Sequence, residues 1–279
     1  MVYSIEKEGP RVVNSIEKEG PRVVNSTKTE SPRVVNSVKT ESPRVVGSMK
    51  EPRGRVVFDL ERQTVRELNQ FLHGDLIEVT EVAVQNPDGA HNIAVGVNAP
   101  IRVDIDGHTG YYAAGMNKEA TVVVHGNAGP GVAENMMSGR VEVGGFASGG
   151  AGASAHGGLL VVRGDAGLRC GISLKGADIV VGGDVGSFSA FMAQAGRMII
   201  CGNAGDGLGD SLYEAVIYVR GDIRSLGADA RIEPMTERDH VAVRELLDAA
   251  KIAHPGGEFK RVASARTLYH WNADSNQTY

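Results

Sequence analysis

The sequence is poor in aromatic residues and in cysteine. Only 5% of its 279 residues are aromatic, so Val, Ile, Leu and Ala must supply most of any interior. The two cysteines, Cys170 and Cys201, show no C-x-x-C spacing, and each lies beside a glycine in an apolar stretch. This context predicts buried thiols rather than metal ligands, and it fits a reducing compartment such as the cytoplasm.

The sequence also lacks a basic excess and a long apolar run. A net charge of -5 and a pI near 5.9 argue against nucleic acid or an anionic membrane as a partner, since binders of either need a basic surface. No apolar run approaches the roughly 18 residues of a membrane span, and the first residues do not resemble a signal peptide. We therefore expect a soluble, cytoplasmic protein with no nucleic-acid or membrane partner.

Residues 1–57 carry an 11-residue tandem repeat. The unit SIEKEGPRVVN occurs twice, is followed by two variants, and ends in a shortened copy, SMKEPRGRVV. Each unit is mostly polar, and its proline removes a backbone donor, so a continuous helix or a sheet core is disfavoured. The repeat segment is predicted to be disordered or loosely extended. A tether for a partner or an anionic ligand is the alternative, and no chemistry is assigned to it.

Residues 58–100 are predicted to form an N-terminal cap. Thr64 and Glu67 have capping-box spacing and precede an apolar stripe, which predicts a short amphipathic helix. Residues 76–84 alternate in polarity as a strand does, and a second short strand is predicted at 93–97 after the turn sequence NPDG.

A period of nineteen residues dominates residues 101–230. Short apolar segments such as TVVV, RVEV and LLVV are each followed by a glycine, and we interpret these glycines as structural turn residues. They are Gly107, Gly126, Gly145, Gly164, Gly183, Gly202 and Gly221. Most of them precede Asn or Asp, whose side chains hydrogen-bond nearby amides in turns and tolerate left-handed backbone.

Such a period predicts a solenoid, in which each repeat is stabilised by stacking on the next. Short β-branched strands with one unit per turn favour an all-β fold, a right-handed parallel β-helix of about seven coils. Alternation along the strands predicts two inward columns. The first is Val103, Val122, Val141, Leu160, Ile179, Met198 and Ile217, and the second begins at Val124.

Residues 231–279 are predicted to form a C-terminal helix and tail. Thr236 and Asp239 begin a helix that runs to Ile252, and we expect short capping helices to cover both open ends of the solenoid. The tail from Phe259 contains the only tryptophan, Trp271. It is a candidate for docking against a partner, and packing on its own solenoid is an equal alternative.

No catalytic, cofactor-binding or metal-binding residue is predicted on this chain. The eight histidines are scattered, the sequence GDGLG (205–209) lacks a Walker lysine, and Ser154 with His156 lacks an orienting acid. Four polar residues at coil corners are surface-contact candidates, with ordinary solvation as the alternative: Asn117, Lys118, Glu134 and Lys175.

Several segments resemble the C-terminal GXGXG domain of glutamate synthase, over about residues 58–275. They are YYAAGMNK (111–118), HGNAG (125–129), VAENMMSG (132–139), AHGG (155–158) and GDSLYE (209–214). The ending R-x-L-Y (266–269) is most similar to the stand-alone β-helix subunit of N-methylglutamate synthase, in methylamine and nitrogen metabolism. The N-terminal repeats lie outside the resemblance.

The resemblance implies a non-catalytic structural subunit of a three-part enzyme complex. One partner would be a glutamine-amidotransferase-like subunit and the other an FMN-bearing glutamate-synthase-like subunit, with an iron-sulfur cluster as a further candidate cofactor on a partner. The assembled complex would convert methylamine and glutamate to N-methylglutamate and ammonia. Two alternatives stay open: the β-helix subunit of a formylmethanofuran dehydrogenase, and a free-standing β-helix binding module. Which amine is used, the stoichiometry and the contact faces are left undetermined.

Overall fold

A computed structural model describes residues 54–266 of the chain. All of the described residues belong to one compact unit. Most of the predicted repeat segment therefore lies outside the described residues. The end of its last copy is described, because Arg55–Val57 form the start of a strand. The predicted boundary at residue 57 is wrong for this reason, since the solenoid sheet already includes Arg55.

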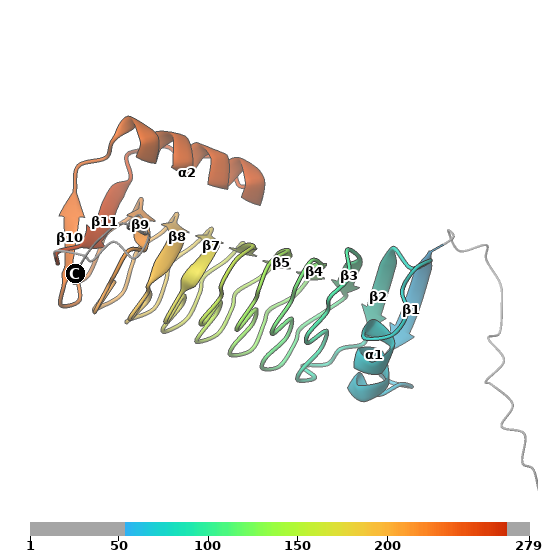
Figure 1. Cartoon of the computed structure of the whole chain (residues 1–279). Coiled ribbons are helices and arrows are strands. Elements are labelled where there is room, and N and C mark those ends of the chain that lie inside the picture. The colour runs from blue at the N-terminus through green and yellow to red at the C-terminus, as the bar shows by residue number, and fades with distance from the viewer. Residues whose placement is uncertain (1–53, 267–279) are drawn as a thin grey trace, which may run out of the picture. The chain divides into compact units, whose positions relative to one another are not determined.

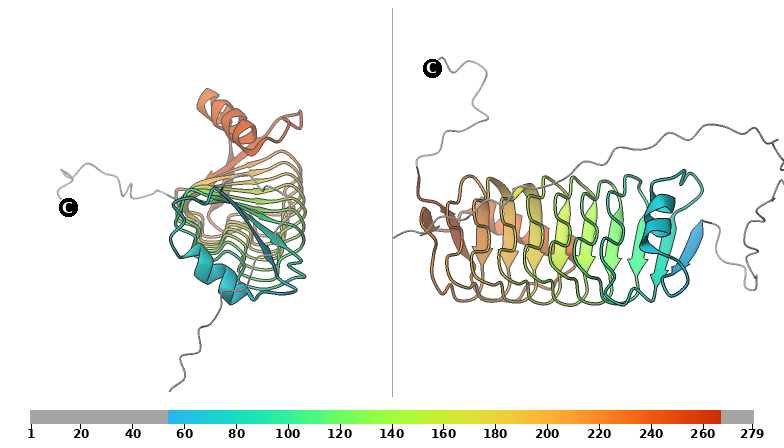
Figure 2. Two further views of the ribbon diagram at one scale, coloured as in Figure 1. Left: turned by 90° about the vertical axis from the view of Figure 1, so that its right-hand side faces the viewer. Right: turned by 90° about the horizontal axis from the view of Figure 1, so that it is seen from below.

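The described residues form a parallel β-helix (Figures 1 and 2). Nine strands stack in chain order, each parallel to the next, and two further strands complete the sheet in the order β9, β11, β10. The predicted all-β solenoid is confirmed. The strands are β1 (Arg55–Asp59), β2 (Glu81–Gln85), β3 (Arg102–Ile105), β4 (Thr121–Val124), β5 (Arg140–Val143), β6 (Leu159–Val162), β7 (Lys175–Val181), β8 (Ala195–Ile200), β9 (Val216–Val219), β10 (Ala230–Glu233) and β11 (Lys260–Ser264).

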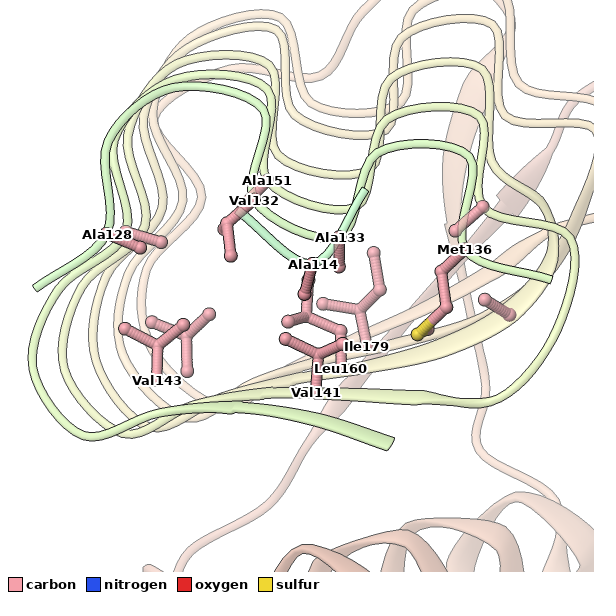
Figure 3. Packing of buried hydrophobic residues seen from close by; sticks show 14 of the residues in the cluster. Ala114, Ala128, Val132, Ala133, Met136, Val141, Val143, Ala151, Leu160 and Ile179 are labelled. Atoms are coloured by element: carbon pink, nitrogen blue, oxygen red, sulfur yellow. The ribbon is translucent and has the colours of Figure 1, made fainter. Parts of the chain in front are cut away.

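The register explains why the sequence repeats every nineteen residues. Val122 lies opposite Val141, and Val141 lies opposite Leu160. Residues nineteen apart therefore stack in one column, and each inward column is apolar. Both predicted inward columns are buried, with every member of the first column at most 1% exposed. Figure 3 shows Val141, Leu160 and Ile179 side by side, with Ala114 and Ala133 of the opposite wall facing them. Stacked aliphatic side chains thus form one continuous core.

The wall opposite the strands has a left-handed backbone at three alternating positions per coil. From Tyr112 onward its columns repeat every nineteen residues with φ values between 53° and 72°, and at least half of each column is not glycine. Along this wall successive amides donate alternately to the following coil, as Gly131 does to Gly149, and to the preceding coil, as Ala133 does to Ala113. Because a left-handed residue with a side chain costs about 1–2 kcal/mol, these inter-coil bonds are what hold the wall in this conformation.

The seven turn glycines follow the strands, but only Gly107 has a left-handed φ. The others are required by close stacking instead. A Cβ at Gly126 would lie 2.6 Å from the carbonyl oxygen of Gly107, and one at Gly221 would lie 2.3 Å from that of Gly202. Glycine at these corners therefore provides room for the neighbouring coil.

The Asn and Asp residues after these glycines form a ladder between coils. Asp165 accepts from the amide of Asp184 at 2.8 Å, Asp184 from Asn203 at 2.6 Å, and Asn203 from Asp222 at 2.8 Å. None of these residues has a left-handed φ. The prediction of bonds within a turn is therefore wrong, since the acceptor serves the amide nineteen residues further along.

Removing one rung of this ladder should cost measurable stability. We expect Asp184→Ala to lower the free energy of unfolding by about 1–3 kcal/mol, because the amide of Asn203 loses its acceptor. Asp184→Asn keeps an acceptor oxygen and should stay within about 0.5 kcal/mol of the parent. Urea unfolding of the three proteins, followed by far-UV circular dichroism, measures the difference. Equal losses in both variants would show that the carboxylate charge, not the hydrogen bond, matters.

Helix α1 (Val65–Leu72) covers the N-terminal end of the left-handed wall. Its predicted capping box between Thr64 and Glu67 is present, and Leu72 is buried in the core. The side-chain amide of Asn69 donates to the carbonyl oxygen of Asn92 at 2.8 Å. The strand predicted at 93–97 is wrong, because Asn92, Ala94 and Gly96 are the first set of left-handed positions.

Helix α2 (Glu237–Ala250) begins at the predicted capping box of Thr236 and Asp239, but it does not cap the end of the solenoid. It lies along the outer face of the sheet, outside the outline of the coils (Figures 1 and 2). The outward side chains of four successive strands are apolar there: Val161, Val180, Ile199 and Tyr218. Beyond β9 the sheet is continued instead by β11, which pairs with β9 in the antiparallel sense. The predicted position of this helix is therefore wrong.

Candidate functional site

A groove of about 660 Å³ lies on the left-handed wall. It crosses five successive coils, so one short stretch of each coil contributes to it. Its lining combines glycine and alanine with larger side chains, and we call the exposed apolar ones among these the rim. The lining residues are Tyr111, Tyr112, Pro130, Gly131, Glu134, Gly149, Gly150, Ala153, Leu168, Arg169, Ile172, Ser187 and Phe188.

Apolar side chains on the rim of this groove are open to solvent. Leu168 is 60% exposed, Tyr111 48% and Phe188 45%. The backbone places them there, because Phe188 and its column mates start the left-handed stretch, while core residues such as Ala133 and Ala151 point inward from the same wall (Figure 3). Glu134 and Arg169 are the charged groups of the lining. Exposed apolar side chains grouped in a concave surface are typical of a binding site.

The middle left-handed column is kept small by the core beneath it. A Cβ at Gly152 would lie 2.8 Å from Cδ1 of Ile179, and one at Gly171 would lie 2.4 Å from Cε of Met198. Alanine or glycine fills this column throughout. The small residues of this column thus leave room for the inward side chains of the sheet, and none of them lines the groove.

Charged residues on the strand face are arranged as ion pairs. Glu142 accepts from Arg140 at 2.9 Å and from Arg163 at 2.8 Å. Partial burial acts to raise the pKa of Glu142, but these hydrogen bonds outweigh it and hold that pKa below its ordinary value. Asp104 is paired in the same way with Arg102 and His125. Carboxylates held ionised by cations are suited to holding strands together rather than to proton transfer.

Ser154, His156 and the two cysteines have structural environments. The amide of Ser154 donates to the following coil and that of His156 to the preceding one, each as part of the regular stacking. Burial raises the pKa of Cys170 to about 12 and that of Cys201 to about 11, so both thiols stay protonated at neutral pH.

Among residues 54–266, no group of three or more His, Cys, Asp or Glu side chains could hold a metal ion. No helix in that range is long and apolar enough to span a membrane.

The surface candidates from the sequence have different environments. Asn117 is buried, and its amide donates to the carbonyls of Ala120 at 2.9 Å and Ser138 at 3.2 Å. Its role in the structure is a side-chain bridge between two coils. Glu134 is the one of the four that lines the groove.

Sequence reasoning missed the apolar rim, although Tyr111 and Leu168 lie three periods apart and could have been aligned as one outward column.

The fold and this surface define the chain as a β-solenoid protein with an exposed apolar groove. It is 54% identical over 224 residues to Protein GlxC of Rhizobium meliloti (strain 1021), covering 79% of this chain and 98% of the relative. The chain therefore belongs to the GlxC family. No family model matches it. The relationship is consistent with the GXGXG-domain, glutamate-synthase-like resemblance of the sequence.

Proposed function

We propose that this chain is a non-catalytic structural subunit of a glutamate-synthase-like complex. The observation that carries the proposal is how the charged groups of the sheet are used. Glu142, Asp104 and Asp178 are each committed to arginine partners, so the stacked coils offer a rigid surface rather than a reaction centre. The segments that resemble the GXGXG domain of glutamate synthase supply the class of complex.

The particular activity that we propose for the complex is N-methylglutamate synthase. Methylamine displaces the amino group of glutamate, so the products are N-methylglutamate and ammonia. On this proposal the reacting groups lie on two partners, an FMN-bearing subunit and a glutamine-amidotransferase-like subunit. The β-helix supports them through its surface.

Affinity purification of the full chain from its native host tests this proposal. We expect a yellow eluate with the absorbance bands of oxidised flavin, together with two co-eluting subunits of the proposed kinds. Incubation of that eluate with glutamate and methylamine should yield N-methylglutamate, and an eluate prepared in the same way from untagged cells is the control. A colourless chain that elutes alone would contradict the proposal and favour a free-standing binding module. Flavin and partners without N-methylglutamate would retain the class of complex and reject the particular activity.

A further inference from the structure

The last described residue, Arg266, lies at one end of the wall that carries the groove. Its guanidinium group pairs with Asp229, and the amide of Ala265 donates to the carbonyl of Asp229 at 2.7 Å. The neighbouring Ala228 accepts from the amide of Ser211 at 3.0 Å, and Ser211 is a left-handed residue of that wall. Residues 267–279 therefore begin at the C-terminal end of the left-handed wall.

The groove is within reach of this segment. Inter-coil hydrogen bonds from Ser173 to Phe191, Met192 to Asp210 and Ser211 to Ala228 mark three steps between the coil of Leu168 and the end of the wall. At about 4.8 Å per step, these steps amount to roughly 14 Å along the solenoid axis, and the offset across the wall from Ser173 to Leu168 adds to this distance. An extended chain covers about 3.3 Å per residue, so Trp271, five residues beyond Arg266, can reach about 16 Å. All thirteen residues span about 43 Å, which is more than the length of the groove.

The composition of the segment also matches the groove. Residues 267–279 read TLYHWNADSNQTY, with Leu268, Tyr269 and Trp271 close together and Asp274 as the one acidic side chain. The groove offers exposed apolar side chains such as Leu168 and Phe188, next to glycine and alanine that are buried or partly buried. Burying an aromatic side chain against such a rim is favourable in proportion to the apolar area removed from water.

We propose that residues 267–279 occupy this groove, with the Trp271 indole against Leu168 and Phe188. Residues 267–279 of the chain would then cover the exposed apolar side chains of its own groove. This contact is intramolecular, so it does not depend on the proposed complex. A partner subunit that binds the same surface would have to displace the segment.

Tryptophan fluorescence of the purified full chain tests the proposal, because Trp271 is the only tryptophan. In the wild type we expect emission at a shorter wavelength than in urea-unfolded protein, with severalfold weaker quenching by acrylamide. Leu168→Asp should shift both readings toward the unfolded values, since the ratio of docked to free segment falls by at least about tenfold when an apolar contact is replaced by a charge. Leu168 is 60% exposed, so the coils should stay folded in this variant, and the free energy of unfolding should fall by no more than the docking that is lost.

Ile77→Asp is the matched control. Ile77 is 89% exposed and lies in the N-terminal cap, so the same chemical change there should leave Trp271 emission unaltered. Three results would overturn the proposal: emission of wild-type Trp271 like that of unfolded protein, no response to Leu168→Asp, or emission that depends on protein concentration. The last would assign the contact to a second copy of the chain. Because the chain is tested alone, failure of the proposed complex would leave these outcomes unaffected.

Discussion

Gly202→Ala is expected to destabilise the protein by about 3 kcal/mol, a large effect for the addition of one methyl group. The new Cβ would lie 2.1 Å from Oδ1 of Asp184 and 2.6 Å from the carbonyl oxygen of Gly183. Asp184 could turn away only by releasing the amide of Asn203, and the Gly183 carbonyl already accepts from the amide of Gly202 at 2.9 Å. Relief of the clash therefore separates two coils. The midpoint of urea unfolding measures the loss.

Gly149→Ala is the matched control for this prediction. A Cβ at Gly149 would have its nearest neighbour, the carbonyl oxygen of Leu168, at 3.4 Å, which is ordinary van der Waals contact, and its φ is not left-handed. This variant should unfold within about 0.5 kcal/mol of the parent. Equal midpoints for the Gly202 and Gly149 variants would mean that the coils move apart easily and that close stacking does not explain the glycine column.

The inward columns could be predicted because two simple rules act together in them. Alternation along a strand fixes which side chains face inward, and stacking requires the same kind of residue nineteen positions later. Val122, Val141 and Leu160 satisfy both rules and are buried. The corner glycines were found by their spacing, but spacing alone does not distinguish a left-handed backbone from a lack of room for a Cβ.

The left-handed wall could not be predicted in the same way. Its positions hold Tyr112, Arg169 and Phe188 as well as glycine, and side chains of these types give no local signal for a positive φ. Their conformation is imposed by hydrogen bonds to the coils on both sides, which are long-range contacts. The apolar alternation of residues 93–97 was consequently interpreted as a strand. The groove was missed for the same reason.

The position of α2 did have a signal in the sequence. The outward residue at the middle of each strand is Asp104 in β3 and Glu142 in β5, but it is Val161, Val180 and Ile199 in β6 to β8. An apolar outer column on a β-helix must be covered by something. The amphipathic stripe of α2 was recognised, but it was assigned to the open end rather than to this column.

Leu247→Ala is expected to release α2 from the sheet without unfolding the coils. Leu247 is 1% exposed and packs in the cluster formed by α2 and the outer column. Removing its side chain should cost about 3 kcal/mol of helix docking, which corresponds to roughly a hundredfold rise in opening. Hydrogen exchange of the amides in the last two turns of α2 should accelerate by that factor, while amides of β6 to β9 keep their protection. Val241→Ala, on the same helix at 37% exposure, is the control and should change exchange little.

The contacts at the two ends of α2 predict where this opening starts. At the N-terminal end, Tyr218 donates to Asp239 at 2.8 Å, and burial together with this bond raises the pKa of Tyr218. At the C-terminal end, Arg140 donates to the carbonyl of Ala249 at 2.7 Å, supplying a cation that the last turn of the helix lacks. Because Leu247 lies beside the second contact, exchange should accelerate most in the last two turns. Uniform acceleration along the helix would show that α2 opens as one unit, and a matching loss of protection in β6 to β9 would show that α2 and the solenoid unfold together.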